Sequence, residues 1–340
     1  MQSYVAYYYL STKELIDYYL QLLNLCTGSS MTKKEFSEIL VNYHLNEVCN
    51  YNCRYCFSKW DIPERLKREQ DIGIRLKVLQ ELHRFFYEPS STNPMAKLMT
   101  WNKVRINFSG GEPMLIHKID EIILEAHRLG FKPSLVTNGS LLNENNLNKI
   151  APYLTKLGIS LDSPNLSTLQ KIGRMTKSGK TYSNQGIIDF VNMARQINPD
   201  IVIKINTIVN ALNKDEDFSA LIENIEPDEW SAIQVLDFFD KGSAINSEEF
   251  DKFIDFHQQR FPDLLFSENN EDYSASFLMI SPENNFFSNR GQFEGEGYKH
   301  SQPIHIVGAE KALSQIDFDY DKYIERHMGK HKLYDLPMVG

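Results

Sequence analysis

The stretch CNYNCRYC (49–56) decides how this chain is interpreted, because it holds three of the four cysteines within eight residues. Soft thiolate ligands bind iron–sulfur clusters, zinc or copper(I), and a structural zinc site takes four protein ligands. Three thiolates on a [4Fe–4S] cluster leave one iron open to a further ligand. The spacing therefore predicts a cluster held by Cys49, Cys53 and Cys56. A zinc site completed by His44 and a disulfide are the alternatives.

The composition is that of an ordinary globular protein and argues against several classes of partner. The chain has 340 residues, 42% of them hydrophobic and 24% charged, which suffices for one α/β barrel domain. A formal net charge of −9 and the lack of a basic stripe argue against a nucleic acid polymer as partner. No run approaches the ~18 apolar residues of a membrane span. The opening MQSYVAYYYL (1–10) is not typical of a signal peptide. Clustered thiols that must stay reduced indicate a cytoplasmic protein.

Strand-like and helix-like segments alternate along the middle of the chain. Such alternation is typical of parallel strands joined by right-handed helical crossovers. Six repeats predict a partial (β/α)6 barrel rather than a closed barrel of eight strands. The predicted strands are 42–48, 103–109, 133–137, 155–161, 201–209 and 231–237, and the predicted helices are 71–87, 117–129, 142–151, 184–197 and 214–224.

The segments outside this alternation predict three parts of the chain. Residues 1–41 are expected to form an N-terminal helical extension, with a helix over 12–25, before a barrel over 42–240. Residues 241–340 are expected to close the active site. They are predicted to hold a helix over 247–260, a loop-rich stretch to about residue 300, and short helices over 308–316 and 319–327.

The alternation within two strands predicts what faces the barrel interior. Arg105, Asn107 and Ser109 share one face of their strand, and Lys204 and Asn206 share one face of theirs. The opposite faces are apolar and are expected to pack on the helices. An inward cation is costly unless it meets an anion, so the pattern predicts a substrate with phosphate or carboxylate groups. An internal ion pair is the alternative.

Taken in order, the motifs of this chain resemble those of the radical S-adenosylmethionine (SAM) superfamily, and within it the viperins, a family of nucleotide dehydratases. The resemblance covers roughly residues 42–330 and implies a [4Fe–4S] cluster, SAM and an external one-electron donor. It does not extend to the membrane helix of viperins, so no membrane association is expected. It rests on CNYNCRYCF (49–57), INFSGGEP (106–113), TNGSL (137–141), ISLDS (159–163), IGR (172–174) and KIN (204–206).

The resemblance also implies roles for individual residues. The cofactor-binding residues are Tyr55, Phe57, Gly110, Gly111, Glu112, Thr137, Asn138, Ser160 and Arg174. The substrate-binding residues are Arg105, Asn107, Ser109, Lys204 and Asn206, and the catalytic residues are Lys204 and Asn206. Tyr273 is a further catalytic candidate as the proton donor, with a bound water as the alternative. The implied reaction uses a 5′-deoxyadenosyl radical to remove the ribose 4′ hydrogen of a nucleoside triphosphate. Loss of water then gives the 3′-deoxy-3′,4′-didehydro nucleotide, a product of antiviral defence.

Three departures from the viperin pattern bear on whether this site binds a nucleoside triphosphate. Viperins carry a P-x-R-W-K segment that binds phosphate, where this chain has Glu229 and Ser231 in place of the two cations. A viperin tyrosine is replaced by Phe277, and a basic C-terminal loop by GQFEGEGYKH (291–300). For a triphosphate to bind, the missing cations would have to be replaced by Arg290, Lys299, His300 or His305.

A nucleoside, a less phosphorylated nucleotide or another small molecule is therefore an alternative substrate. A peptide-modifying radical SAM enzyme is a further alternative. It is less favoured because the chain carries no extra cysteine-rich segment for further clusters.

Overall fold

The structure is a computed structural model that describes residues 33–56, 71–88, 93–236, 240–293 and 297–329. The expected helix over 12–25, and Phe57 and Cys26, lie outside these residues. No helix in the described ranges has the length and apolar character that a membrane crossing requires.

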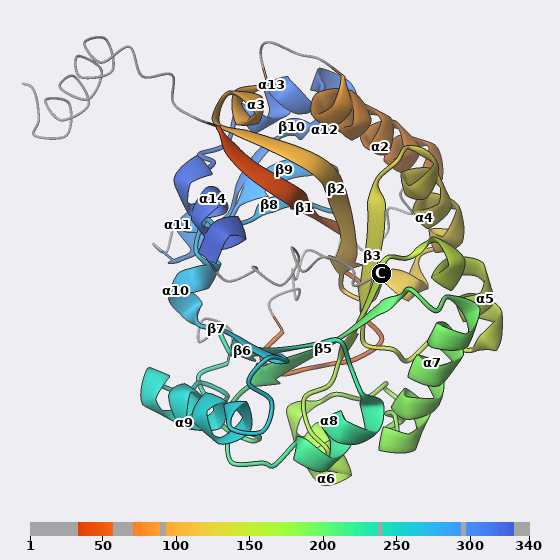
Figure 1. Ribbon diagram of the computed structural model, residues 1–340, viewed down its shortest axis with the longest axis vertical. Helices are drawn as coiled ribbons and strands as arrows, with labels where there is room; N and C mark the ends of the chain where they lie inside the picture. Colours follow the sequence, from red (N-terminus) through yellow and green to blue (C-terminus); the bar gives the residue numbers. More distant parts are fainter. Residues whose placement is uncertain (1–32, 57–70, 89–92, 237–239, 294–296, 330–340) are drawn as a thin grey trace, which may run out of the picture.

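A curved sheet of ten strands forms the frame of the molecule, with helices around its outer face (Figure 1). Six neighbouring strands run parallel in chain order, which confirms the predicted partial barrel. These strands are β1 (Lys34–Asn46), β2 (Met99–Gly110), β3 (Lys132–Thr137), β4 (Lys156–Ser160), β5 (Val202–Val209) and β6 (Glu229–Gln234).

Most of the described helices between these strands lie close to the predicted ranges, but the short helices over 94–98 and 166–172 were not predicted. The helices are α2 (Ile72–Tyr87), α3 (Pro94–Leu98), α4 (Ile119–Arg128), α5 (Glu144–Ile150), α6 (Leu166–Ile172), α7 (Asn184–Ile197) and α8 (Ser219–Ile225), with short 3-10 turns at Pro113–Leu115 and Ala151–Tyr153. Capping side chains fix the starts of several helices. At the start of α7, for example, the Ser183 hydroxyl accepts a hydrogen bond from the Gly186 amide.

The first strand begins earlier than the sequence predicted. β1 starts at Lys34, so its first half lies in the stretch assigned to the N-terminal extension. Lys34 and Glu35 are exposed, and Glu38 faces the interior, so this half lacks the apolar run that marks a buried strand. The pairing of residues 34–46 with 99–110 along almost their whole length defines the strand instead.

The prediction of a loop-rich stretch to about residue 300 is wrong. This stretch holds α10 (Asn270–Tyr273) and α11 (Arg290–Phe293), and four strands that extend the sheet at both ends. β7 (Leu265–Glu268) pairs with β6, while β8 (Leu278–Ile280), β9 (Asn285–Ser288) and β10 (Lys299–Pro303) extend the sheet from β1. Strands of three to five residues are too short to show a period of two. The remaining helices are α9 (Ser247–Gln258), α12 (Ile304–Val307), α13 (Ala309–Leu313) and α14 (Tyr320–Gly329).

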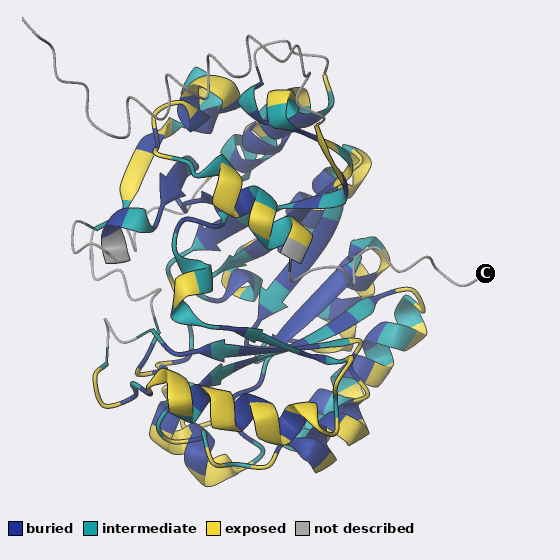
Figure 2. Ribbon diagram, turned by 60° about the vertical axis from the view of Figure 1, so that its left-hand side comes forward, coloured by how far each residue is buried: buried dark blue, intermediate teal, exposed yellow. Residues whose placement is uncertain are grey.

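The core lies between the outer face of the sheet and the helices. In β1 the side chains of Ile39, Val41, Tyr43 and Leu45 are fully buried, as are those of Val104, Ile106 and Phe108 in β2. Exposed residues gather on the outer faces of the helices, while the strands are mostly buried (Figure 2). The predicted division of β2 into an apolar outer face and a polar inner face is confirmed, and polar side chains are left to line the interior.

Candidate active site

The loop that carries the three cysteines is held at both sides by backbone hydrogen bonds. It leaves β1 at Asn46, whose carbonyl accepts a hydrogen bond from the Gly111 amide at 2.8 Å. The Val48 carbonyl accepts one from the Glu112 amide, also at 2.8 Å. On the other side the Asn52 amide donates to the Gly173 carbonyl at 3.2 Å. The loop is thus clamped between the turn after β2 and the end of α6.

Three glycines are required where this loop passes. A β-carbon at Gly111 would lie 2.2 Å from the Val48 carbonyl oxygen, and one at Gly110 2.4 Å from that of Asn46. At Gly173, with φ of +85°, a β-carbon would lie 2.3 Å from the Asn52 carbonyl oxygen. The sequence predicted that the paired glycines admit a ligand. In the structure the close approach is made by the backbone of the cysteine loop.

Glu112 connects the turn after β2 to the end of β3. Its fully buried carboxylate accepts hydrogen bonds from the Thr137 hydroxyl at 2.6 Å, the Asn138 amide at 2.8 Å and the Met114 amide at 3.0 Å. Burial raises the pKa of Glu112 although these donors act in the opposite sense. Glu112 and Thr137 therefore position the mouth of the barrel through their contacts with each other.

Asn138 continues this connection to the cysteine loop itself. Its side-chain amide donates to the side-chain oxygen Oδ1 of Asn50 at 2.9 Å and approaches the Cys49 sulfur at 3.6 Å. The Asn50 side chain in turn donates to the Ser140 hydroxyl at 2.6 Å. The first cysteine is thus placed by the loop after β3.

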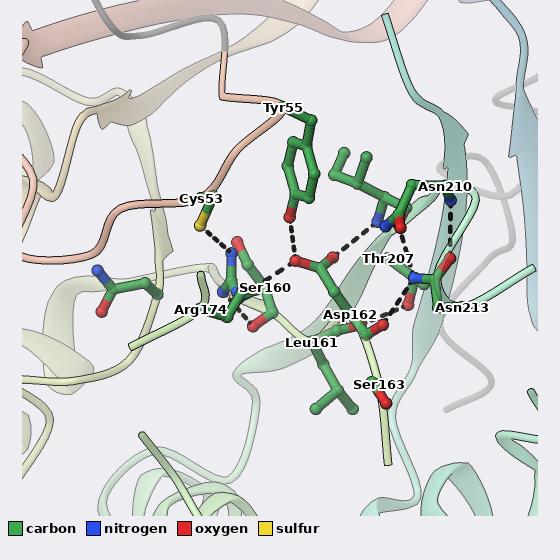
Figure 3. A network of polar contacts seen from close by, with 12 residues as sticks. Cys53, Tyr55, Ser160, Leu161, Asp162, Ser163, Arg174, Thr207, Asn210 and Asn213 are labelled. Atoms are coloured by element: carbon green, nitrogen blue, oxygen red, sulfur yellow. Dashed lines mark hydrogen bonds and ion pairs between the residues drawn. The ribbon is translucent and has the colours of Figure 1, made fainter. Parts of the chain in front are cut away.

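Asp162, just after β4, is the centre of a second network (Figure 3). Its fully buried carboxylate accepts a hydrogen bond from the Tyr55 hydroxyl, pairs with Arg174 Nε at 3.2 Å and accepts from the Ile208 amide at 2.8 Å. Arg174 also donates to the Ser160 carbonyl at 2.7 Å and approaches the Cys53 sulfur at 3.8 Å. Tyr55, Ser160 and Arg174, all implied to bind the cofactor, are therefore brought together around one carboxylate.

The environment of the cysteines follows from this burial. Burial raises the pKa of Cys53 to about 12, with Arg174 acting in the opposite sense and Asp162 and the other two cysteines adding to the rise. Burial likewise raises the pKa of Cys49. The pKa of Cys49 is also raised by Cys56, so the thiols of the loop affect one another's titration.

Below this mouth, polar side chains line the inner face of the strands. The side-chain nitrogen Nδ2 of Asn107 donates to Oδ1 of Asn42 at 2.9 Å, and Oδ1 of Asn107 accepts from the Ser134 hydroxyl at 2.9 Å. Arg105 is buried and pairs with Glu38 of β1 at 2.5 Å. The ion pair that the sequence left open as an alternative is therefore present at Arg105.

A second interior ion pair joins Lys156 of β4 to Glu229 of β6. Lys204 of β5 lies beside it, because Lys204 and Glu229 are register partners and both Lys156 and Glu229 are influenced by its charge. Burial, together with the Arg105 and Lys204 cations, lowers the pKa of Lys156 to about 7 despite the attraction of Glu229. Glu229, the residue that departs from the viperin pattern, thus has a cationic partner on another strand.

Comparison with known proteins identifies the family. The model of the radical SAM superfamily matches residues 43–225. A protein of Pseudoalteromonas ulvae, named S-adenosylmethionine-dependent nucleotide dehydratase, is 34% identical over 86% of this chain and 94% of its own length. A protein of the same name from Psychrobacter lutiphocae is 36% identical over 85% of this chain and 95% of its own length. The chain belongs to the viperin-like radical SAM enzymes.

Solved structures of radical SAM enzymes share the fold at low identity. SuiB of Streptococcus suis bound to S-adenosylmethionine superposes with a TM-score of 0.57 at 11% identity, covering 93% of this chain and 73% of that one. The enzyme anSMEcpe with bound AdoMet gives 0.58 at 14% identity, covering 85% and 79%. These likenesses support the partial barrel.

As a radical SAM enzyme the chain uses a [4Fe–4S] cluster and SAM. The described residues fit the cluster better than a single metal ion. No three His, Cys, Asp or Glu side chains in the described ranges gather as one ion requires, whereas a four-iron cluster separates its thiolates more widely. The ring of His44, the alternative zinc ligand, packs edge-on against Phe287 at 5.5 Å. Cys49, Cys53 and Cys56 are the residues that would hold the cluster.

Tyr273, the remaining candidate catalytic residue of this radical SAM enzyme, lies with Phe277 on the β7 side of the interior. The Tyr273 ring lies 5.2 Å from that of Phe277, and the Arg326 guanidinium stacks on Phe277 at 3.7 Å. Arg326 also pairs with Glu268 at 2.6 Å. Burial and the Glu268 charge raise the pKa of Tyr273, which keeps its hydroxyl protonated. Phe277, which replaces the viperin tyrosine, is therefore a packing partner of Tyr273.

Three of the basic residues that would have to compensate for the missing cations, Arg290, His300 and His305, interact with other residues. Arg290 pairs with Asp317 at 2.6 Å and Asp319 at 2.5 Å. His300 stacks on Phe287 at 5.5 Å, and the pKa of His305 is lowered by burial and by Lys77 of α2.

Sequence reasoning did not assign roles to Asn50, Lys156 or Asp162. For Lys156 a signal was present, since it shares the inward face of β4 with Gly158 and Ser160. Asn50 and Asp162 lie beside recognised motifs, but their partners are distant in sequence.

Proposed function

We propose that this enzyme removes water from a nucleotide, taking the ribose 4′ hydrogen and giving the 3′-deoxy-3′,4′-didehydro form. The relatives named nucleotide dehydratases, similar over nearly their whole lengths, support this activity. So does the arrangement of the site, where the cysteine loop lies above an interior lined by polar and cationic side chains.

The cluster and SAM, when bound, supply a 5′-deoxyadenosyl radical that removes a hydrogen atom. The chain binds and orients the two partners and excludes water from them. We assign Lys204 and Asn206 of β5 to the substrate, because they share the inward face of β5. Lys204 lies beside the Lys156–Glu229 pair, and Asn206 lies two residues nearer the mouth. Gly158 leaves room for this, since a β-carbon there would lie 3.1 Å from the Asn206 amide nitrogen.

The same proposal includes the cellular setting. An external one-electron donor reduces the cluster, the reaction takes place in the reducing cytoplasm, and the product serves antiviral defence. Gly110, Gly111, Ser160 and Arg174 contribute to the SAM site in this proposal, chiefly through backbone groups.

The test uses anaerobically reconstituted protein with SAM, dithionite and pools of nucleotides. We expect nucleotide-dependent formation of 5′-deoxyadenosine together with a nucleotide that has lost one water. Cys53→Ala is expected to lose both products, whereas Cys26→Ala, outside the cysteine loop, is expected to keep them. Cleavage of SAM without a dehydrated nucleotide in any pool would refute the proposal.

A further inference from the structure

The charged side chains in the interior form a nearly balanced group. Arg105 pairs with Glu38 at 2.5 Å, and Lys156 pairs with Glu229. Lys204 lies close enough to act on both Lys156 and Glu229, and it forms no ion pair with a carboxylate of the described residues. Three cations thus face two carboxylates, and the neighbouring Glu268, on which Lys204 also acts, is neutralised by its ion pair with Arg326. The group carries one net positive charge when Lys156 is protonated and none when Lys156 is neutral.

The members of this group are held in place and are removed from bulk water. Only 7% of the Arg105 side chain and 8% of the Lys156 side chain are exposed, against 18% for Glu38 and 15% for Glu229. Arg105 and Lys156 lie on β2 and β4, with the β3 strand between them, and Glu229 lies beside Lys204 across β5 and β6. Solvent and salt screen charges at such positions weakly, so each charge attracts or repels an anion that enters the barrel interior.

The charge of the ligand must match this group. A phosphate monoester carries about −1.5 to −2 charges near pH 7, which one lysine and the amide and hydroxyl groups of Asn206 and Ser231 beside it can accommodate. Asn206 and Ser231 are register partners on β5 and β6. Each further phosphate brings about one more negative charge toward Glu38 and Glu229. Opening either ion pair to receive it would leave a buried carboxylate without its cation.

We propose that the enzyme selects a nucleotide with a single phosphate, which Lys204 binds, and that the Lys156–Glu229 pair excludes the triphosphate. This inference rests on the proposed nucleotide dehydratase function and names its substrate class. Glu229 is in this view a specificity-determining residue, which acts through the charge that it places beside Lys204.

The first experiment compares phosphate number with the base held constant. The reconstituted enzyme receives nucleoside, monophosphate, diphosphate and triphosphate for each of the four bases, and kcat/KM is measured from the dehydrated product. We expect the kcat/KM of the monophosphate of the preferred base to exceed that of its triphosphate by about tenfold or more, because the triphosphate brings about two additional negative charges toward Glu38 and Glu229. Preference for the triphosphate, or equal use of the nucleoside, would overturn this inference while leaving the dehydratase function standing. No product from any of them would overturn both.

Charge variants then test the role of Glu229. Glu229→Gln adds one positive charge to the group and should move the triphosphate-to-monophosphate ratio of kcat/KM upward by about tenfold. Lys156→Met should lower that ratio. The double variant Lys156→Met with Glu229→Gln removes both charges of the pair and should return the ratio to within about threefold of wild type.

The matched control is Glu223→Gln on α8, which makes the same change of total charge at a surface ion pair between Glu223 and Arg260. It should leave the ratio unchanged. Calorimetric titration of each variant with monophosphate and triphosphate gives the same comparison as affinities, independent of turnover. A ratio that stays at the wild-type value in Glu229→Gln, or that moves equally in Glu223→Gln, would contradict the role of Glu229.

Discussion

At the scale of single residues, Asp162 joins the segments that build the cysteine site. Its carboxylate accepts from Tyr55 in the loop and from the backbone of β5, and pairs with Arg174 after α6. Its carbonyl accepts from the Asn213 side chain at 2.6 Å. A buried charge with this many partners is expected to be expensive to remove.

We expect Asp162→Asn to lower the free energy of unfolding by about 3 kcal/mol, because it leaves the buried Arg174 without its counter-charge. Denaturant unfolding of the reconstituted protein measures this, and iron per chain should fall with it. Asp251→Asn on the exposed face of α9 is the control and should stay within about 0.5 kcal/mol of wild type. Wild-type stability and iron content in Asp162→Asn would contradict this role.

Lys156 gives the residue-scale prediction for pH. Its pKa is lowered from the ordinary 10.5 to about 7 by burial and by Arg105 and Lys204, against Glu229. The unfolded chain therefore binds more protons than the folded one between these two values. The contribution of Lys156 to stability rises with pH through that window and is smallest below it.

The free energy of unfolding of wild type relative to Lys156→Met should accordingly rise by about 1–3 kcal/mol from pH 7 to pH 9. Unfolding curves of both proteins across this range measure the difference. A difference that stays flat, or falls, would show that Lys156 is not held with a lowered pKa.

The sequence predicted which polar residues stand at strand ends but not how they pair. Glu112 and Arg174 were assigned to the cofactor, and the structure shows their side chains bonded to Thr137, Asn138 and Asp162. These partners lie 12 to 26 positions away, a separation that no local pattern reports. The cysteine spacing, in contrast, lies within one loop and could be recognised directly.

At the scale of elements, Gly173 shows how α6 and the cysteine loop depend on each other. It ends α6 with φ of +85°, and its carbonyl accepts from the Asn52 amide. We expect Gly173→Ala to lower stability by clearly more than about 1 kcal/mol, the cost of a positive φ for alanine, because its β-carbon would also meet the Asn52 carbonyl at 2.3 Å.

Gly179→Ala is the matched control for this change. Its φ of +75° is similar, but no atom lies within 4 Å of the added β-carbon. It should lower stability by about 1 kcal/mol and keep the iron content of wild type. Equal losses in the two variants would mean that the contact with the cysteine loop is not what requires glycine at position 173.

The helices and strands were predicted correctly where the segment is long enough for its hydrophobic period to be recognised. The six strands and most of the helices between them follow from their apolar periodicity, and most of their bounds agree within a few residues, but α3 and α6 were not predicted. The first half of β1 and the short strands β7 to β10 were missed. They are defined by pairing with distant strands, and β8 shows this clearly because it pairs with β1 far earlier in the chain.

At the scale of the whole molecule, hydrogen bonds join helix α14 of the C-terminal region to the first strand, β1. The Tyr323 hydroxyl of α14 donates to the Leu40 carbonyl at 2.9 Å and lies 3.1 Å from the Leu40 amide nitrogen, which donates to it. Leu40 is the register partner of Arg105, so this contact braces β1 beside the interior ion pairs.

We expect Tyr323→Phe to lower the free energy of unfolding by about 1–3 kcal/mol, since it leaves buried backbone groups of Leu40 without a partner. Thermal unfolding with and without a bound nucleotide measures the loss. Tyr320→Phe, on the same helix and packed against Phe318 at 4.8 Å, is the control. Equal effects of the two changes would argue against the brace.

The account as a whole depends on the cysteine site removing a hydrogen atom from the sugar of a nucleotide. The most direct measurement supplies the reconstituted enzyme with nucleotides deuterated at the ribose 4′ position and follows both products by mass spectrometry. We predict that deuterium appears in 5′-deoxyadenosine and that the nucleotide loses water in step with it. Formation of 5′-deoxyadenosine without deuterium, or of a deuterated product with no loss of water, would contradict the account.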